Sequence, residues 1–264
     1  MRGARGAKFA LRLTTAAATV AVRNMLAFSP GLSHKAGVTP LFCRGLRMFD
    51  PAAARRLMVD GQIRTADVTN LDLLAAMLAV PREAFVPPAL AAQAYRDSDL
   101  PLGSGRMLIK PMLLAKLIQA AQIGEGDHVL DVGCGTGYSS AVLARLAGTV
   151  VALEEDADLA RRAKEALAAA GAANVTVVSG PLRAGWSQRQ PYDVILLNGA
   201  AEVVPDSLGQ QLKPTGRLAC VFGRPPSGKA MLYRSIEGRL VGRPVFDAAA
   251  PVLPGFVAPA EFVF

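Results

Sequence analysis

A short stretch in the middle of the chain, VLDVGCGTGYSS at 129–140, constrains the fold more than any other. It opens with an apolar run, Val129–Val132, that carries one acid, Asp131, near its end. Three glycines follow at alternate positions: Gly133, Gly135 and Gly137. This order predicts a strand, a tight turn without Cβ atoms and the start of a helix. Such a turn lets a nucleotide-like ligand lie against bare backbone at the end of a parallel strand.

A second acid, Glu154, ends the next apolar run, Thr149–Leu153. We expect it to lie beside the glycine turn and to accept hydrogen bonds from two ribose hydroxyls. The spacing Gly-x-Gly-x-Gly differs from the Gly-x-Gly-x-x-Gly of dinucleotide-binding proteins. Two alternatives stay open: Asp131 caps the following helix, or Glu154 is a solvated acid beside its acidic neighbours.

Strand and helix patterns alternate from residue 127 onwards. The expected strands are His128–Val132, Thr149–Leu153, Val175–Ser179, Val194–Leu197 and Leu218–Phe222. The expected helices are Ser139–Leu146, Ala157–Ala170 and about 204–211. This alternation predicts a Rossmann-like, doubly wound α/β fold with a mostly parallel sheet and helices on both faces. A C-terminal antiparallel hairpin is expected from Met231–Ile236 and Arg239–Phe246, joined by Glu237-Gly238.

The N-terminal part of the body is expected to be helical. Helical spacing covers 51–80, with Thr69 or Asn70 capping a second helix that Pro81 stops. Further helices are expected at Ala89–Tyr95 and at 111–122, and 103–105 is expected to be a Gly/Ser loop.

The positive net charge of +8 comes from the first 47 residues. Eight of the 29 Lys and Arg residues lie there with no acid, which leaves 21 basic and 21 acidic residues in 48–264. We therefore expect two parts, a basic leader (1–47) and a globular body (48–264), and no nucleic-acid binding by the body. The leader is interpreted as a start codon assigned too early or as a mitochondrial transit peptide. The first interpretation predicts a cytoplasmic protein and the second a mitochondrial one.

Other composition features narrow the classes of protein. No apolar run is long enough to span a bilayer, so no membrane partner is expected. Three scattered cysteines and two histidines predict no metal site and a reducing compartment. Cys134 lies within the glycine turn, where a small side chain is tolerated.

Reading outwards from the glycine turn, several strings resemble the protein-L-isoaspartate O-methyltransferase family. The strings are Val80-Pro81-Arg82-Glu83-Ala84-Phe85-Val86-Pro87, Ala94-Tyr95-Arg96-Asp97, Leu100-Pro101-Leu102-Gly103, Asp131 to Tyr138, Pro191-Tyr192-Asp193-Val194-Ile195 and Leu212 to Leu218. Together they cover about residues 50–223, most of the body.

The resemblance implies a monomeric methyltransferase that uses S-adenosylmethionine to methylate the α-carboxylate of isoaspartyl residues in damaged proteins. It also implies the cofactor-binding residues: Asp131, Gly133, Cys134, Gly135, Thr136, Gly137 and Glu154. The glycines would approach the methionine and ribose, and Asp131 would stabilise the turn or bind the cofactor's amino group. A carboxylate is already ionised at neutral pH, so the protein mainly has to position it.

The chain departs from the family pattern in the substrate loop. The loop reads Arg106-Met107-Leu108-Ile109-Lys110, with Met107 and Ile109 where the family has threonine and serine. Neither side chain can hydrogen-bond a carboxylate, and an unpaired buried carboxylate is costly. No catalytic residue is therefore assigned; Arg106 and Lys110 could supply charge instead, or lie solvated in the loop.

Two further departures lie near the expected cofactor and substrate. Pro181 replaces an acid that contacts the adenine, and Asn198-Gly199-Ala200 replaces a Thr-Ala-Ala type sequence. Three functions stay open: a divergent isoaspartyl methyltransferase, a catalytically silent relative that binds a protein partner or a modified terminus, and a methyltransferase for a less polar acceptor.

Overall fold

The computed structural model describes residues 49–236 and 239–259. The expected leader and the Glu237-Gly238 connection lie outside these ranges. No helix in the described part of the chain is long and apolar enough to cross a membrane.

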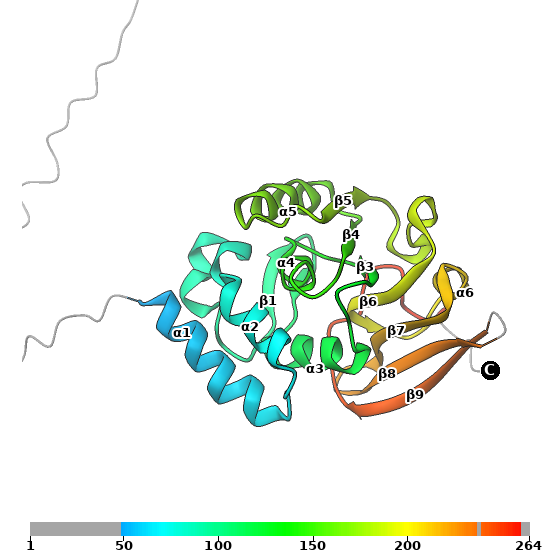
Figure 1. Ribbon diagram of the computed structural model, residues 1–264, viewed down its shortest axis with the longest axis horizontal. Helices are drawn as coiled ribbons and strands as arrows, with labels where there is room; N and C mark the ends of the chain where they lie inside the picture. Colours follow the sequence, from blue (N-terminus) through cyan, green and yellow to red (C-terminus); the bar gives the residue numbers. More distant parts are fainter. Residues whose placement is uncertain (1–48, 237–238, 260–264) are drawn as a thin grey trace, which may run out of the picture. The chain divides into compact units, whose positions relative to one another are not determined.

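A seven-stranded sheet in the order β5-β4-β3-β6-β7-β8-β9 is the centre of the fold (Figure 1). Its strands are β3 (His128–Val132), β4 (Thr149–Glu154), β5 (Val175–Ser179), β6 (Tyr192–Ala201), β7 (Leu212–Arg224), β8 (Ser227–Ile236) and β9 (Arg239–Asp247). The strands β3 to β7 pair in parallel. The last two pairings, β7–β8 and β8–β9, are antiparallel, and the second of them is the C-terminal hairpin that the sequence predicts.

The direction of strand addition reverses at β3, because β4 and β5 lie on one side of it and β6 and β7 on the other. In open α/β sheets a ligand binds at the carboxyl ends of the strands, where the order reverses. The glycine turn follows β3 and therefore lies at this point.

Alternate residues along the strands point into two separate cores. One core lies under the helices α2 (Leu71–Ala79), α3 (Pro111–Ala121), α4 (Tyr138–Leu143) and α5 (Ala157–Ala169). The other is covered by the short helix α6 (Asp206–Gly209), a 3-10 turn at Leu182–Ala184 and the C-terminal residues Leu253 and Phe256. The predicted doubly wound fold is confirmed. The helices that cover the α6 face of the sheet are shorter than those on the other face.

The N-terminal segment is helical but less regular than its spacing predicts. Helix α1 (Pro51–Met58) continues as a π-helical turn, Val59–Ile63, and a 3-10 turn, Arg64–Ala66. Asn70 caps α2 by accepting a hydrogen bond from the Leu73 amide, at 2.8 Å, so the predicted cap is confirmed. The helix expected at Ala89–Tyr95 is instead a 3-10 turn, Pro88–Gln93, because the hydrogen bonds after Pro87 close over three residues.

A two-stranded hairpin is the main element that the sequence pattern missed. Strands β1 (Leu100–Gly103) and β2 (Arg106–Leu108) pair antiparallel around the turn at Ser104-Gly105. Only the turn was expected there, since strands of three or four residues are too short to show alternation. Helix α6 is also shorter than expected, because it starts only after Pro205, at Asp206, and the chain enters β7 at Leu212.

Candidate cofactor and substrate site

The glycine turn lies between β3 and α4 with all three glycines at positive φ: +73° at Gly133, +58° at Gly135 and +93° at Gly137. Added Cβ atoms would collide with different elements. At Gly133 the atom would lie 2.6 Å from the Arg106 Nη2, and at Gly135 it would lie 2.7 Å from the Leu102 Cδ1. At Gly137 it would meet Leu167 of α5 at 3.0 Å. The first two glycines therefore face the β1–β2 hairpin, and the third is required for helix packing.

Glu154 lies at the end of β4 with its side chain fully buried. Its Oε1 accepts hydrogen bonds from the amides of Glu155 and Asp156, at 3.0 and 3.3 Å. Its Oε2 accepts from the Gly135 amide at 2.7 Å and from the Arg106 Nη2 at 3.2 Å. The alternative of a solvated acid is wrong, because this carboxylate fastens the glycine turn to the start of α5.

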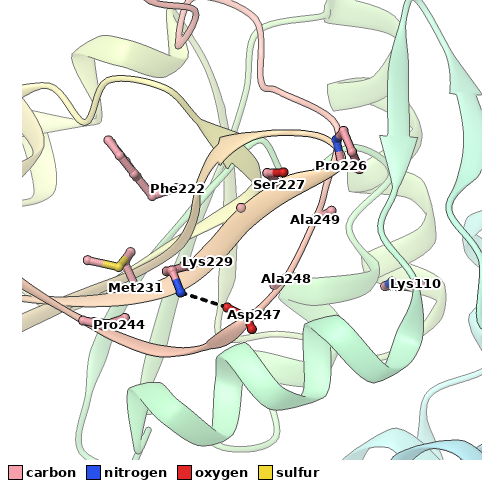
Figure 2. A pocket seen from close by; sticks show the side chains of 11 residues that line it. Lys110, Phe222, Pro226, Ser227, Lys229, Met231, Pro244, Asp247, Ala248 and Ala249 are labelled. Carbon is pink, nitrogen blue, oxygen red and sulfur yellow. Dashed lines mark hydrogen bonds and ion pairs between the residues drawn. The ribbon is translucent and has the colours of Figure 1, made fainter.

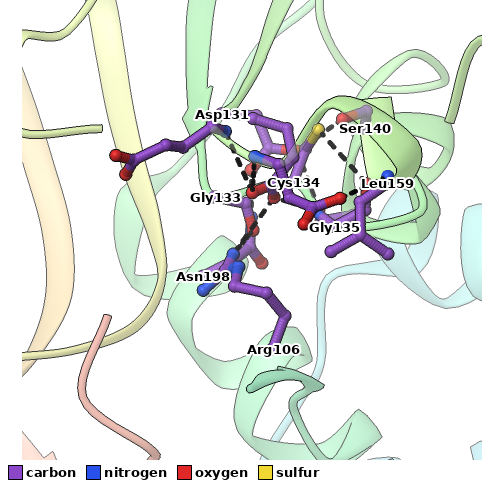
Figure 3. Close-up of polar contacts among 12 residues, drawn as sticks. Arg106, Asp131, Gly133, Cys134, Gly135, Ser140, Leu159 and Asn198 are labelled. Atoms are coloured by element: carbon purple, nitrogen blue, oxygen red, sulfur yellow. Dashed lines mark hydrogen bonds and ion pairs between the residues drawn. The ribbon is translucent and has the colours of Figure 1, made fainter. Parts of the chain in front are cut away.

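Asp131 is also buried, and three neutral donors surround its carboxylate (Figure 3). The hydroxyls of Ser139 and Ser140 donate to Oδ2 at 2.7 and 2.5 Å, and the Asn198 side-chain amide donates to Oδ1. Burial is the main cause that raises the pKa of Asp131 to about 6, and these hydrogen bonds oppose it. Helix α4 has no side-chain cap, so Asp131 does not act as its N-cap.

Arg106 reaches from β2 into the space beside the glycine turn (Figure 3). Arg106 is only 5% exposed, and its Nη2 donates to the Gly133 carbonyl at 2.8 Å as well as to Glu154. Its Nε is buried without a hydrogen-bond partner among the described residues. The alternative of a solvated loop cation is therefore wrong for Arg106.

The other substrate-loop residues lie in different surroundings. Leu108 and Ile109 are buried in the core under the helices, with Ile109 2% exposed. Met107 and Lys110 are half-buried, and the Lys110 amide donates to Asp99 Oδ1 at 2.8 Å. The position that carries serine in the family is thus a core position here, and Arg106 is the loop residue that meets the glycine turn.

The N-terminal string around Arg82 clamps the loop and the glycine turn together. The guanidinium of Arg82 is fully buried and donates to the carbonyls of Ala94 and Ile109, each at 2.8 Å. It also lies 4.7 Å above the ring of Tyr138, the first residue of α4. The Thr136 hydroxyl donates to the Phe85 carbonyl at 2.5 Å. Thr136 therefore holds the turn in place, and Cys134 is buried in the same core.

The edge of the site near β5 has Pro181 where the family pattern has an acid, and an aromatic ring lies nearby. Pro181 is exposed and starts the 3-10 turn Leu182–Ala184. An added Cβ at Gly180 would lie 3.2 Å from the ring of Trp186, the single tryptophan of the chain. Trp186 is thus a built-in fluorescent reporter for this edge.

Lys110 borders a cavity of about 880 Å³ (Figure 2). The cavity lies between the β7–β8 connection and the segment after β9. Apolar side chains including Phe222 and Met231 line it, and Lys229 pairs with Asp247 across one wall at 3.0 Å. Lys110 borders this cavity only four residues after Arg106, so at most about 14 Å separates the Cα atoms of the two residues.

Among the described residues, no group of three or more His, Cys, Asp or Glu side chains is placed to hold a metal ion.

Sequence reasoning missed the donors around Asp131 and the partner of Glu154. Ser139 and Ser140 follow the glycine turn directly, and Asn198 lies in β6, which pairs with β3. Polar residues at the ends of neighbouring parallel strands are the signal that could have found Asn198. No local signal joins Arg106 to Glu154, which lie 48 residues apart.

Comparison with known proteins matches most of the body to one protein family. The profile of the family described as protein-L-isoaspartate(D-aspartate) O-methyltransferase matches residues 54–243. A protein-L-isoaspartate O-methyltransferase of Methylorubrum extorquens is 44% identical over 190 residues, which cover 72% of this chain and 82% of that protein.

Solved structures agree on the fold. A protein-L-isoaspartate O-methyltransferase superposes with a TM-score of 0.67 at 26% identity, covering 76% of this chain and 66% of its own. A β-aspartate methyltransferase from Plasmodium falciparum, solved with S-adenosyl-L-homocysteine, superposes with a TM-score of 0.65 at 17% identity and covers 75% of this chain and 97% of its own.

Proposed function

The chain belongs to the protein-L-isoaspartate(D-aspartate) O-methyltransferase family, and we propose that it methylates the α-carboxylate of isoaspartyl residues in proteins and peptides with S-adenosylmethionine. The observation that carries this proposal is the convergence of a glycine turn and two buried acids, Asp131 and Glu154, where the strand order reverses. It acts in the cytoplasm as a monomer, without a nucleic-acid or membrane partner.

The residues around the turn fit the cofactor. Gly133 and Gly135 leave the backbone of the turn without Cβ atoms on the side that faces the hairpin, where the Arg106 and Leu102 side chains lie in this structure. Glu154 lies at the end of β4, where its carboxylate would accept from a ribose diol once one of its present donors leaves, and Asp131 supplies negative charge for the amino group or the sulfonium. S-adenosylmethionine supplies, when bound, a methyl group on a positively charged sulfur.

The chain's own contribution to catalysis is positioning. In the transfer, a carboxylate oxygen of the substrate forms a bond to the methyl carbon as the carbon–sulfur bond breaks, and no proton has to move. The reaction needs aligned reactants and excluded water more than an acid or a base. The cavity beside Lys110 is a suitable place for the polypeptide that flanks the isoaspartyl residue, because it combines apolar walls with a cation for the carboxylate.

A second candidate, a catalytically silent relative that binds a protein partner, is favoured by one observation. Ile109 is a core residue where the family has its serine, so the loop offers no hydroxyl there to the substrate carboxylate.

Calorimetric titration of the full chain with S-adenosylhomocysteine tests the cofactor site. We expect binding by the natural chain and at least tenfold weaker binding by Glu154→Gln, because hydrogen bonds to a charged acceptor contribute about 1.5–3 kcal/mol. Glu155→Gln is the matched control, because this neighbour meets the site only through its backbone amide. No binding by the natural chain at millimolar ligand would contradict the proposed function.

A further inference from the structure

The carboxylate of Glu154 has no acceptor position left for a ligand in this structure. Its two oxygens offer about four lone pairs, and four donors take them: three backbone amides and Arg106. The amides belong to the glycine turn and to the start of α5, so a ligand cannot displace them without unfolding the site. Arg106 is the one partner that a side-chain movement removes.

Arg106 also takes a second acceptor that the cofactor would use. Its Nη2 donates to the Gly133 carbonyl at 2.8 Å, and it approaches the bare side of Gly133 more closely than a Cβ would allow. The Arg106 guanidinium is thus hydrogen-bonded both to the Gly133 carbonyl and to the Glu154 carboxylate. A ligand that carries an ammonium group and a ribose diol needs the same two acceptors.

We propose that Arg106 is an internal competitor of the cofactor: S-adenosylmethionine binds only when the Arg106 guanidinium leaves Glu154 and Gly133. This inference rests on the proposed function. The hairpin supplies the means of release, because β1 and β2 form a separate two-stranded sheet outside the central one. The buried Nε of Arg106, which has no hydrogen-bond partner among the described residues, weakens the hold of the closed arrangement.

Competition of this kind lowers the apparent affinity by the fraction of molecules in the open arrangement. If about one molecule in ten is open, removing the competitor strengthens binding about tenfold. Arg106→Gln removes the charge and most of the reach while keeping a polar side chain. We therefore expect Arg106→Gln in the full chain to bind S-adenosylhomocysteine about tenfold more tightly than the natural chain, as measured by calorimetry.

Arg162→Gln is the matched control. Arg162 donates to the Leu102 carbonyl of the same hairpin at 3.0 Å and pairs with Asp158, and neither interaction involves Glu154. Its binding of S-adenosylhomocysteine should equal that of the natural chain. Equal strengthening in both variants would mean that a loosened hairpin, and not competition for Glu154, is responsible, and would overturn the proposal.

Thermal unfolding gives a second readout, because Arg106→Gln leaves a buried carboxylate without its cation. The variant should melt at a lower temperature than the natural chain without ligand, and its melting temperature should rise more when S-adenosylhomocysteine is added. Arg106→Lys keeps the charge with a smaller head and should fall between the two in affinity; it serves as the test if Arg106→Gln does not fold.

The outcomes separate this inference from the proposed function. Binding by the natural chain together with unchanged or weaker binding by Arg106→Gln overturns the competition and leaves the cofactor site intact; weaker binding would mean that Arg106 holds the cofactor. Binding by neither protein, with both folded by circular dichroism, overturns the cofactor site and the competition together.

Discussion

Asp131 and Glu154 are both buried at the glycine turn, but different kinds of hydrogen-bond donor surround their carboxylates. A guanidinium and three backbone amides surround Glu154, whereas hydroxyl and amide side chains surround Asp131. Neutral donors offset burial only in part, which is why the pKa of Asp131 rises to about 6. The proton affinity of Asp131 therefore depends on folding.

This raised pKa predicts a pH-dependent stability. Because the folded chain holds the Asp131 proton more tightly than the unfolded chain, Asp131 stabilises the fold below pH 4 and loses that contribution as the pH rises through 6. Between pH 4 and pH 7 the natural chain should lose about 2 kcal/mol of unfolding free energy relative to Asp131→Asn. Urea denaturation of both proteins at the two pH values measures this, and a pH-independent difference between them would contradict it.

Restoring the threonine and serine hydroxyls of the family in the substrate loop should change the activity. Met107→Thr combined with Ile109→Ser should raise kcat/KM for an isoaspartyl peptide, because hydroxyls can then pair with the substrate carboxylate. Ile109 is a core residue, so the serine should also cost about 3 kcal/mol of stability, which urea denaturation would show. An unchanged kcat/KM in a folded variant would favour a less polar methyl acceptor.

At the scale of single residues, the sequence predicts where a side chain lies in the fold more readily than which groups it contacts. The glycine turn and Glu154 can be predicted from the order of the strands, since β3 and β4 pair in parallel and their carboxyl ends meet at the same edge of the sheet. The ion pair between Arg106 and Glu154 could not be predicted, because it depends on how a hairpin too short to show alternation folds back over the sheet.

At the scale of elements, the clamp centred on Arg82 explains why an N-terminal string accompanies a cofactor turn 50 residues later. Arg82 joins the turn after α2 to the end of β2 and to the first residue of α4. Its removal would leave the Ala94 and Ile109 carbonyls buried without these donors, and each such loss costs about 1–3 kcal/mol.

Arg82→Met should therefore lower the free energy of unfolding by about 3 kcal/mol, as measured by urea denaturation. Arg96→Met is the matched control, because Arg96 is exposed, and it should change stability by less than about 0.5 kcal/mol. Equal effects of the two substitutions would contradict the role of Arg82 as a clamp.

Elements with clear periodicity were predicted well, and irregular ones were not. The bounds of β3 and β5 agree with their apolar runs, and α5 ends within one residue of the expected position. The π-helical turn after α1, the 3-10 turn after Pro87 and the β1–β2 hairpin carry no periodic signal, so tertiary packing decides them.

At the scale of the whole described body, the fold places the glycine turn and the cavity beside Lys110 at opposite ends of one short loop. Arg106 faces the glycine turn, and Lys110 borders the cavity between the β7–β8 connection and the segment after β9. With the methyl donor at the turn and the polypeptide in the cavity, as proposed above, the loop would lie between the two ligands. This arrangement accounts for how a scaffold without an assigned acid or base can carry out methyl transfer by positioning.

The most direct test of this account is transfer of a labelled methyl group from S-adenosylmethionine to a peptide that contains one isoaspartyl residue. The matched control peptide carries normal aspartate at the same position. We predict a base-labile methyl ester on the isoaspartyl peptide and background label on the aspartyl peptide. Background label on both peptides, from a chain that binds S-adenosylhomocysteine, would contradict the proposed methylation of isoaspartate and favour a silent relative or a different acceptor.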